Sequence, residues 1–402
     1  MIPESVERRA RWVLDTLGGG ELGFGDDVPY REAAWERVER GERPQGDELA
    51  EAFWHLARLE ERGGPRDAHD RFPGSASTLD PLDPPLERLR GRLGLERPRW
   101  GGAPFAVALT HDVDVPWRWT QRGIRNAAGR MRARTRGRDW REVLREGRGL
   151  AAMPLHRLRG TDPNWRFAEL AALEAKRGAR STFFVIAGHG HREDGFAPEV
   201  YERLRPRLVE TLLEADAEVG LHGSYTSADD VGRLAAEKQA LESLAGFLAG
   251  QRYHFLRVDP HRNLAPLVDL GFRYDTSLGF ADAPGFRAGL AHPFRPWSEE
   301  RGGPLSLVEI PLALMDTTLA EAKYLGLSAR EAERPVLALL DWAAARGGAF
   351  AILWHTNRFD PATAAGWDRL YERILDAVRE RGGVCLSAGE LAAEAEERLA
   401  PA

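Results

Sequence analysis

The sequence has little of several patterns that define large classes of protein. Cys385 is its one cysteine, which excludes an internal disulfide framework and a cysteine-rich zinc module. No run approaches the ~18 consecutive apolar residues that a membrane-spanning helix needs. The first residues have no apolar stretch behind their charges, so we expect no secretory signal. These absences predict a cytoplasmic protein.

Two further absences concern ligands. The formal net charge is −6 over 402 residues, and binding to nucleic-acid phosphates needs a basic face, so we expect no nucleic-acid partner. No GxGxxG or Walker pattern follows any of the strands expected below, so no nucleotide-binding turn is predicted. A chain of this length with 43% hydrophobic residues can bury a sizeable core and can form two domains.

The first hundred residues are predicted to form a mainly helical N-terminal domain. Residues 5–17 have helical apolar spacing and end at three glycines, and Asp47 is a candidate cap for a second helix with a broad apolar stripe. A proline-rich stretch at 80–85, followed by Pro98 and two glycines, marks the boundary near residue 100. We therefore assign residues 1–100 to this domain.

After residue 100, short runs rich in β-branched and aromatic residues alternate with helical segments. This alternation is typical of a parallel sheet, and about eight strands favour closure into a barrel. We predict an α/β fold over residues 101–402, a distorted (β/α) barrel of about seven to eight parallel strands. The expected strands are 105–110, 181–187, 218–222, 254–258, 273–277, 305–314, 349–355 and 383–386.

A basic insertion interrupts this pattern between the first two strands, at about 115–165. Residues 118–159 contain thirteen arginines and only three acidic residues, with tryptophans nearby. Such a surface could bind an anionic carrier, an anionic polymer or the lipid headgroups of a membrane surface. The alternative is a helical insertion whose charges are simply solvated.

Candidate functional residues gather where the predicted strands end. In a barrel of βα units, the carboxyl ends of the strands carry the reactive groups. Charged and histidine side chains occur at these ends: Asp112 and Asp114 after the first strand, His222 in the third, Arg252 and His254 at the fourth, and His355 in the seventh.

This set of residues favours a catalytic metal centre. Two carboxylates as close as Asp112 and Asp114 resist joint ionisation unless a cation lies beside them. Aspartate and histidine together suit zinc and similar divalent metals, and a site with about three protein ligands keeps a position for an activated water. Taken singly, each residue is explained equally well as a turn, cap or core residue. Their shared position at three strand ends favours the metal site.

The ordered motifs resemble those of the polysaccharide deacetylase superfamily. Leu-Thr-His-Asp-Val-Asp, Glu-Val-Gly-Leu-His-Gly-Ser-Tyr, Arg-Tyr-His-Phe-Leu-Arg and Leu-Trp-His-Thr-Asn follow one another along the chain. The first is similar to the motif of a bacterial branch, and the N-terminal Phe-Trp-His-Leu-Ala-Arg and Asp-Arg-Phe-Pro resemble the leader domain of that branch. The resemblance spans nearly the whole chain. It implies a metal-dependent hydrolase that removes acetyl groups from an N- or O-acetylated saccharide or polysaccharide precursor.

The resemblance also implies catalytic roles for individual residues. Asp112 resembles the general base, and Arg252 resembles the arginine that steers it. His355 resembles the general acid, and Asp316 resembles the carboxylate that orients this acid. Separately, because the strand ends of a barrel meet at one rim, we expect Asp112, Asp114, His222 and His355 to lie in one pocket.

The metal ligands depart from the family pattern. The adjacent aspartate pair of the family is here Asp-Val-Asp, so the ligand role falls to Asp114 or the two aspartates exchange roles. His222 resembles the first metal histidine, but Thr226 stands where the second one is expected. Either another residue fills the gap, with His254 as the candidate, or metal binding has been lost. We predict that Asp114, His222 and His254 bind a divalent metal, with zinc favoured.

Two residues are candidates for substrate binding, and two alternative functions stay open. Arg287 and Trp354 lie in motifs that support the resemblance, and we predict that they bind substrate. Thr226 favours a catalytically silent barrel that binds carbohydrate, although such a barrel has little use for both an acid and a base. A related barrel amidohydrolase that acts on a non-sugar amide is the other alternative.

Overall fold

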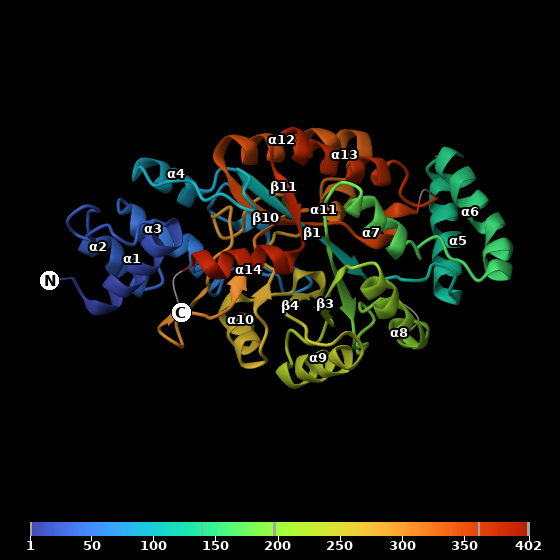
Figure 1. Ribbon diagram of the computed structural model, residues 1–402, viewed down its shortest axis with the longest axis horizontal. Helices are drawn as coiled ribbons and strands as arrows, with labels where there is room; N and C mark the ends of the chain where they lie inside the picture. Colours follow the sequence, from blue (N-terminus) through green and yellow to red (C-terminus); the bar gives the residue numbers. More distant parts are fainter. Residues whose placement is uncertain (1, 139, 196–197, 361, 400–402) are drawn as a thin grey trace.

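The structure is a computed structural model that describes residues 2–138, 140–195, 198–360 and 362–399. A curved parallel β-sheet lies at its centre, and helices surround it (Figure 1). The strand order is β8-β5-β4-β3-β2-β1-β10-β9, and β11 pairs with β1. The strands are β1 (Phe105–Val113), β2 (Thr182–Ile186), β3 (Glu218–Gly223), β4 (Gly250–Tyr253), β5 (Tyr274–Asp275), β8 (Val308–Glu309), β9 (Leu312–Met315), β10 (Gly348–Leu353) and β11 (Val384–Leu386).

The sheet forms an incomplete barrel. Its eight main strands curl through 267°, and all neighbouring strands pair in parallel. The predicted distorted (β/α) barrel is therefore confirmed. The single strand expected at 305–314 is wrong, because this segment forms both edges of the barrel, β8 and β9, with Ile310 and Pro311 between them. Pro311 has no N–H group with which to continue a ladder.

The first strand shows why these segments form a covered parallel sheet. All nine residues of β1 are buried, as expected for a strand that is covered on both faces. Ala106 and Ala108 pack in one apolar cluster with residues of α14 (Ala388–Arg398). The helices that follow the other strands or precede them are α7 (Phe167–Ala175), α8 (Pro198–Glu214), α9 (Val231–Ala245), α10 (Pro260–Asp269), α11 (Asp316–Ala320), α12 (Ala329–Arg346) and α13 (Trp367–Glu380).

The N-terminal region is helical, as the sequence predicts, but it shares its core with the barrel. The Asp47 side chain accepts a hydrogen bond from the backbone N–H of Ala50, as expected for a helix cap. The Trp12 ring lies 5.4 Å from that of Trp297, centroid to centroid, and its Nε1 donates to the Arg295 carbonyl at 3.0 Å. The boundary near residue 100 stays a prediction. The elements concerned are α1 (Glu4–Leu17), α2 (Glu32–Glu39), α3 (Glu48–Leu56), α4 (Pro85–Arg92) and the antiparallel pair β6 (Trp297–Ser298) and β7 (Gly303–Pro304).

The basic insertion forms a helical hairpin. Its two helices are α5 (Gln121–Arg136) and α6 (Trp140–Arg159), which pack against each other. They stand at the end of the molecule opposite the N-terminal helices (Figure 1). Within the described part of the chain, no helix is long and apolar enough to cross a membrane.

The fourth strand differs from the prediction in a way that matters for the site. The strand expected at 254–258 is wrong: β4 ends at Tyr253, and a short 3-10 turn follows over His254–Leu256. Phe255 and Leu256 have φ values of 63° and 54°, a left-handed backbone that cannot continue a strand. His254 therefore lies at the carboxyl end of β4, beside the carboxyl ends of the other strands.

Candidate functional site

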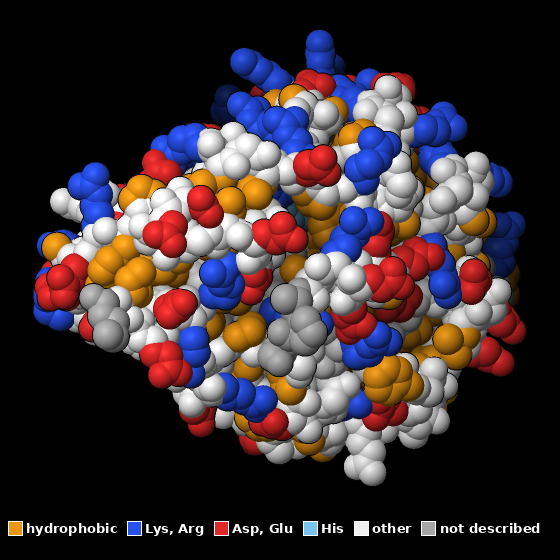
Figure 2. Space-filling view, turned by 60° about the vertical axis from the view of Figure 1, so that its left-hand side comes forward, with side chains coloured by type: hydrophobic (Ala, Val, Ile, Leu, Met, Phe, Trp, Pro, Cys, Tyr) orange, Lys and Arg blue, Asp and Glu red, His pale blue; other side chains and the backbone are white. Residues whose placement is uncertain are grey.

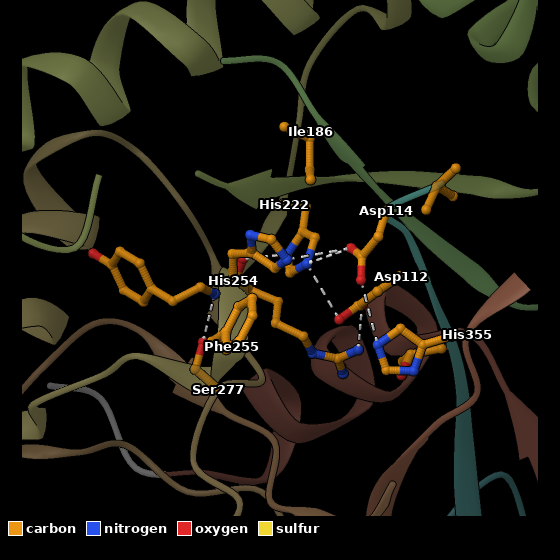
Figure 3. A network of polar contacts seen from close by, with 12 residues as sticks. Asp112, Asp114, Ile186, His222, His254, Phe255, Ser277 and His355 are labelled. Carbon is orange, nitrogen blue, oxygen red and sulfur yellow. Dashed lines mark hydrogen bonds and ion pairs between the residues drawn. The ribbon is translucent and has the colours of Figure 1, made fainter. Parts of the chain in front are cut away.

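A pocket of about 720 Å³ opens at the carboxyl ends of the strands. Asp112, Asp114, His254 and His355 line it, although they come from three separate parts of the chain. In Figure 3 these side chains and that of His222 point toward one another. The expectation that the strand-end residues meet in one pocket therefore agrees with the geometry, and their chemical roles remain predictions.

Asp112 is held in place by a buried arginine. Its Oδ1 accepts a hydrogen bond from Arg252 Nη1 at 2.9 Å, and Arg252 Nε donates to the Thr276 carbonyl at 3.0 Å. The guanidinium also lies over the Phe184 ring, 4.5 Å from its centroid. These contacts fix the carboxylate in one orientation. Its second oxygen, Oδ2, is left facing His222 Nε2 at 3.4 Å.

Asp114, His222 and His254 form the predicted ligand cluster. Asp114 Oδ1 lies 3.3 Å from His222 Nε2 and 3.6 Å from His254 Nε2. Within the described residues, one ligand atom from each of the three lies within 4.8 Å of the other two. Burial alone would raise the pKa of Asp114, but the two imidazoles hold it well below its usual range.

Two atoms of this cluster have donor or acceptor capacity that the rest of the protein does not use. Asp114 Oδ1 and His222 Nε2 are buried, and neither has a hydrogen-bond partner within the described parts of the chain. His222 Nδ1 lies 3.0 Å from the Arg252 carbonyl, so Nδ1 carries the proton and Nε2 presents its lone pair to the cluster. Buried polar atoms are rarely left unpaired. One oxygen and two nitrogens arranged in this way fit a divalent metal ion.

Asp194 is a residue of this site that the sequence analysis missed. Its Oδ1 lies 3.4 Å from His254 Nδ1, and Oδ2 accepts the backbone N–H groups of Gly190 and His191 at 3.0 and 2.9 Å. Burial opposes its ionisation, but the contact with His254 and the backbone donors lower its pKa to about 2. Asp194 lies in a loop, away from any strand end or quoted motif, so no sequence pattern identifies it.

The two carboxylates around His254 also affect its charge. Burial would lower the pKa of the imidazole, but Asp114 and Asp194 together raise it to about 9. The two ring nitrogens face different partners, with Nε2 toward Asp114 and Nδ1 toward Asp194. A carboxylate on one nitrogen and a metal on the other is a common arrangement for a histidine ligand.

His355 lies on the other side of Asp114. Its Nδ1 is 2.6 Å from Asp316 Oδ1, and its Nε2 is 3.6 Å from Asp114 Oδ2. Asp316 is itself held by Arg358 Nε, which donates to Oδ2 at 2.9 Å. Burial lowers the pKa of His355, but Asp316 and then Asp114 raise it to about 9. The contact with Asp316 thus favours the protonated imidazole.

The two residues predicted to bind substrate lie elsewhere. Arg287 is fully buried and donates two hydrogen bonds to Glu61, at 2.8 and 2.6 Å. Trp354 is also fully buried, and its ring lies 5.6 Å from those of Trp367 and Tyr371. Neither side chain lines the pocket, so the prediction for these two residues is corrected. A buried guanidinium needs a carboxylate partner, and Arg287 has its partner in the N-terminal region.

Residues outside the predicted set contribute to the pocket wall. Arg71, from the N-terminal region, lines the pocket and donates from Nη1 to the Phe255 carbonyl at 2.9 Å. Asn126, Arg130 and Arg134 of α5 also line the pocket. The Asp-Arg-Phe-Pro motif contains Arg71, but nothing in the sequence related it to the pocket. The arginine-rich composition of the insertion was visible, whereas its contact with the pocket was not.

Comparisons with known proteins bear on the fold. No model of a protein family matches the sequence, and no curated protein matches it. The structure is similar to the crystal structure of a proposed polysaccharide deacetylase from Mycobacterium smegmatis, with a TM-score of 0.50 and 19% identity over 76% of this chain and 95% of that chain. The chain has the fold of that protein. A proposed polysaccharide deacetylase from Pseudomonas aeruginosa PAO1 gives a TM-score of 0.49 and 14% identity, over 80% of this chain and 98% of that one.

Proposed function

We propose that this protein is a metal-dependent hydrolase that removes acetyl groups from an N- or O-acetylated saccharide or polysaccharide precursor. The observation that carries the proposal is the arrangement around Asp114. The predicted ligand cluster lies beside Asp112, a carboxylate held by Arg252, and His355, an imidazole held by Asp316. The fold shared with the Mycobacterium smegmatis protein supports the same reaction class.

Asp114, His222 and His254 would hold the metal, and their oxygen and nitrogen donors favour zinc. A divalent ion bound there supplies a Lewis acid for the acetyl carbonyl and lowers the pKa of a coordinated water. The protein contributes the orientation of each donor. The Arg252 carbonyl orients His222, and the Asp194 carboxylate orients His254.

Asp112 is the general base of the proposed reaction. Arg252 holds its Oδ1, so Oδ2 is free to take a proton from the attacking water. The water oxygen forms a bond to the acetyl carbon, and the bond from that carbon to the sugar nitrogen or oxygen then breaks. Arg252 steers the base without contacting the reacting atoms.

His355 is the general acid. Asp316 binds its Nδ1, which leaves Nε2 facing Asp114 and the pocket. Asp316, with Asp114 and Asp112, raises the pKa of this imidazole to about 9, which favours the protonated form that the departing amine or hydroxyl requires. The products are acetate and the free amine or alcohol.

The pocket has cations that suit an anionic group on the substrate. Arg130 and Arg134 of α5 line it, although they also pair with Glu146 and Glu142 of α6, and Lys323 lines it from the loop after α11. A phosphate-bearing carrier attached to the saccharide would meet these cations, and such a carrier is part of the proposal. The cytoplasmic location and the absence of a nucleic-acid partner, both expected from the sequence, stay predictions.

The proposal is tested by metal content and acetate release measured on the same preparation. The purified protein should contain a stoichiometric divalent metal and release acetate from an N-acetylated oligosaccharide, and a chelator should abolish this activity until zinc is restored. His355→Ala should lower kcat by about 10²- to 10⁴-fold with the metal retained. His156→Ala, on α6, is the matched control and should change neither.

Other outcomes of this experiment point elsewhere. Loss of metal in His355→Ala would make His355 a ligand and not the acid. A protein that binds oligosaccharide but contains no metal and releases no acetate would be the silent carbohydrate-binding barrel that Thr226 suggests. Acetate release from non-sugar amides alone would favour the related amidohydrolase.

A further inference from the structure

The two faces of the α5–α6 hairpin have different surroundings. Gly123, Asn126, Arg130 and Arg134 of α5 line the pocket, and their spacing of three, four and four residues places them on one face of the helix. Glu146 of α6 also faces inward, where it is buried against Arg118 at 2.9 Å. The hairpin itself stands at one end of the molecule (Figure 1). The hairpin therefore has an inner face that belongs to the pocket and an outer face that is exposed to solvent and accessible to a binding partner.

The outer face of α6 is apolar to an unusual degree. Trp140, Leu144, Leu155 and Leu158 are 58, 63, 47 and 85% exposed. With 3.6 residues per turn, these four positions fall within about 60° of arc on the helix. They make up four of the ten large hydrophobic side chains that are exposed within the described residues. We call these four residues the apolar stripe of α6.

Arginines border the apolar stripe. Arg141, Arg148 and Arg159 are exposed on α6 next to it, and Arg132 and Arg136 are exposed on α5. Over residues 118–159 the sequence has thirteen arginines against three acidic residues. Acidic and basic side chains are instead interspersed over most of the face shown in Figure 2. The hairpin thus combines an exposed apolar stripe with a strong excess of positive charge.

We propose that the α5–α6 hairpin binds the surface of an anionic lipid bilayer. A helix with an apolar face that includes tryptophan and leucine, flanked by arginines, lies in the plane of the interface between headgroups and acyl chains. Anionic headgroups attract each nearby arginine as well. The charge excess argues for this partner over a second copy of the chain, because two such hairpins would repel each other. Nucleic acid would match the arginines but would leave the leucines exposed.

Docking of the hairpin would place the pocket at the membrane surface. The same helix that carries the arginines of the outer face forms one wall of the pocket through Asn126, Arg130 and Arg134. A saccharide attached to the bilayer through a phosphate could then reach the ligand cluster while its phosphate meets those arginines. This consequence rests on the proposed function, whereas the docking itself does not.

Vesicle co-sedimentation of the full chain tests the proposal. The protein should bind vesicles of phosphatidylcholine mixed with phosphatidylglycerol, and should bind pure phosphatidylcholine far less. Binding should weaken steeply between 0.1 and 0.5 M salt, since the Debye length falls below about 10 Å. Leu144→Ser and Leu158→Ser should each weaken binding by about tenfold, from the loss of a buried leucine. Phe247→Ser is the matched control: Phe247 is 66% exposed, beyond the end of α9.

Each remaining outcome would overturn the docking proposal. These are no binding of the wild type at low salt, equal binding to both kinds of vesicle, or equal losses in Phe247→Ser and Leu158→Ser. Light scattering without vesicles tests whether the apolar stripe instead binds a second copy of the chain. If the wild type is a dimer and Leu158→Ser is a monomer, the stripe mediates self-association and the docking proposal is wrong. Acetate release from a soluble oligosaccharide should be unchanged in Leu158→Ser, so a failure of docking remains distinct from a failure of the proposed reaction.

Discussion

At the scale of single residues, the proposed metal site requires a second histidine beside His222, and His254 is the candidate. His222 and Arg252 are partners in the register of β3 and β4, and His254 follows Arg252 by two residues. We propose that His254, next to the strand that neighbours β3, replaces the metal histidine expected at position 226, which holds threonine. Neighbouring strands lie only about 4.8 Å apart, which makes such a replacement geometrically simple.

His254→Ala therefore tests the ligand assignment. The substitution leaves two protein ligands where about three are needed, so we expect loss of metal and of acetate release together. Thr226→Ala should affect neither, because Thr226 does not belong to the ligand cluster. Metal content by atomic spectroscopy, measured alongside activity, is the readout. If His254→Ala retains its full complement of metal, the replacement idea is wrong.

Asp194 provides a second test that does not depend on turnover. Asp194→Asn keeps the size of the side chain but removes the charge that faces His254 Nδ1 at 3.4 Å. We expect metal affinity to fall by about 10- to 100-fold, as for other carboxylates that orient a histidine ligand. Competition with a chelator of known affinity measures this fall. Glu193→Gln changes the adjacent carboxylate and should leave the metal affinity unaltered. An equal fall in metal affinity in both variants would show that Asp194 does not specifically orient His254.

The sequence located candidate residues best where a motif placed them along a strand, although their roles stay predictions. Asp112, Asp114, His222 and His355 each lie in or directly after a strand, and the sheet brings their side chains together. Asp194 was missed because its loop has no periodicity that fixes where it packs. Arg287 and Trp354 were misassigned for a different reason. A motif identifies the residue, but whether its side chain faces the pocket or the core depends on tertiary packing.

At the scale of elements, the turn after β4 determines where the His254 side chain lies. The run from His254 to Val258 has the β-branched and aromatic composition of a strand, which explains the wrong prediction. Left-handed backbone at Phe255 and Leu256 is uncommon for such residues, so no sequence rule favours it here. A strained backbone of this kind persists only where surrounding contacts hold it, and Arg71 makes one of them.

Arg71→Ala should consequently weaken the site from a distance. The guanidinium donates to the Phe255 carbonyl and to the Tyr324 hydroxyl, both at 2.9 Å, and it contacts no predicted metal ligand. We expect a lower metal affinity together with faster limited proteolysis near the turn. Arg262→Ala, which removes an exposed arginine on neighbouring α10, serves as the control. Unchanged metal affinity in Arg71→Ala would show that the turn keeps its conformation without the hydrogen bonds of Arg71.

At the scale of the whole molecule, the sequence predicted the barrel and its helical leader but not their joint core. Alternating strand and helix patterns are local, and they identified most of the sheet. The contact between Trp12 and Trp297, or between Glu61 and Arg287, joins positions more than two hundred residues apart. Contacts of this kind depend on the assembled fold, and no single-sequence pattern encodes them. The same holds for the pocket wall that α5 provides.

The pair of Glu61 and Arg287 joins the N-terminal region to the barrel and should make stability depend on pH. Both side chains are fully buried. Burial would raise the pKa of Glu61, but Arg287 and Arg58 lower it from 4.5 to about 2. A carboxyl with a depressed pKa in the folded state stabilises the protein above its unfolded pKa, and this contribution is lost as the pH falls toward 2. A shift of this size corresponds to about 3 kcal/mol.

Glu61→Gln should destabilise the protein by about 3 to 5 kcal/mol at neutral pH, because it leaves a buried arginine without its charged partner. Denaturant unfolding from pH 7 to pH 2 measures both effects, and the variant should lose less stability than the wild type between pH 4.5 and pH 2. Combining Glu61→Met with Arg287→Met removes both charges and should recover part of the loss, since Arg58 loses its contact with Glu61 but keeps Glu60 as a partner. Parallel pH profiles for the wild type and Glu61→Gln would mean that this ion pair does not contribute to the coupling of the two regions.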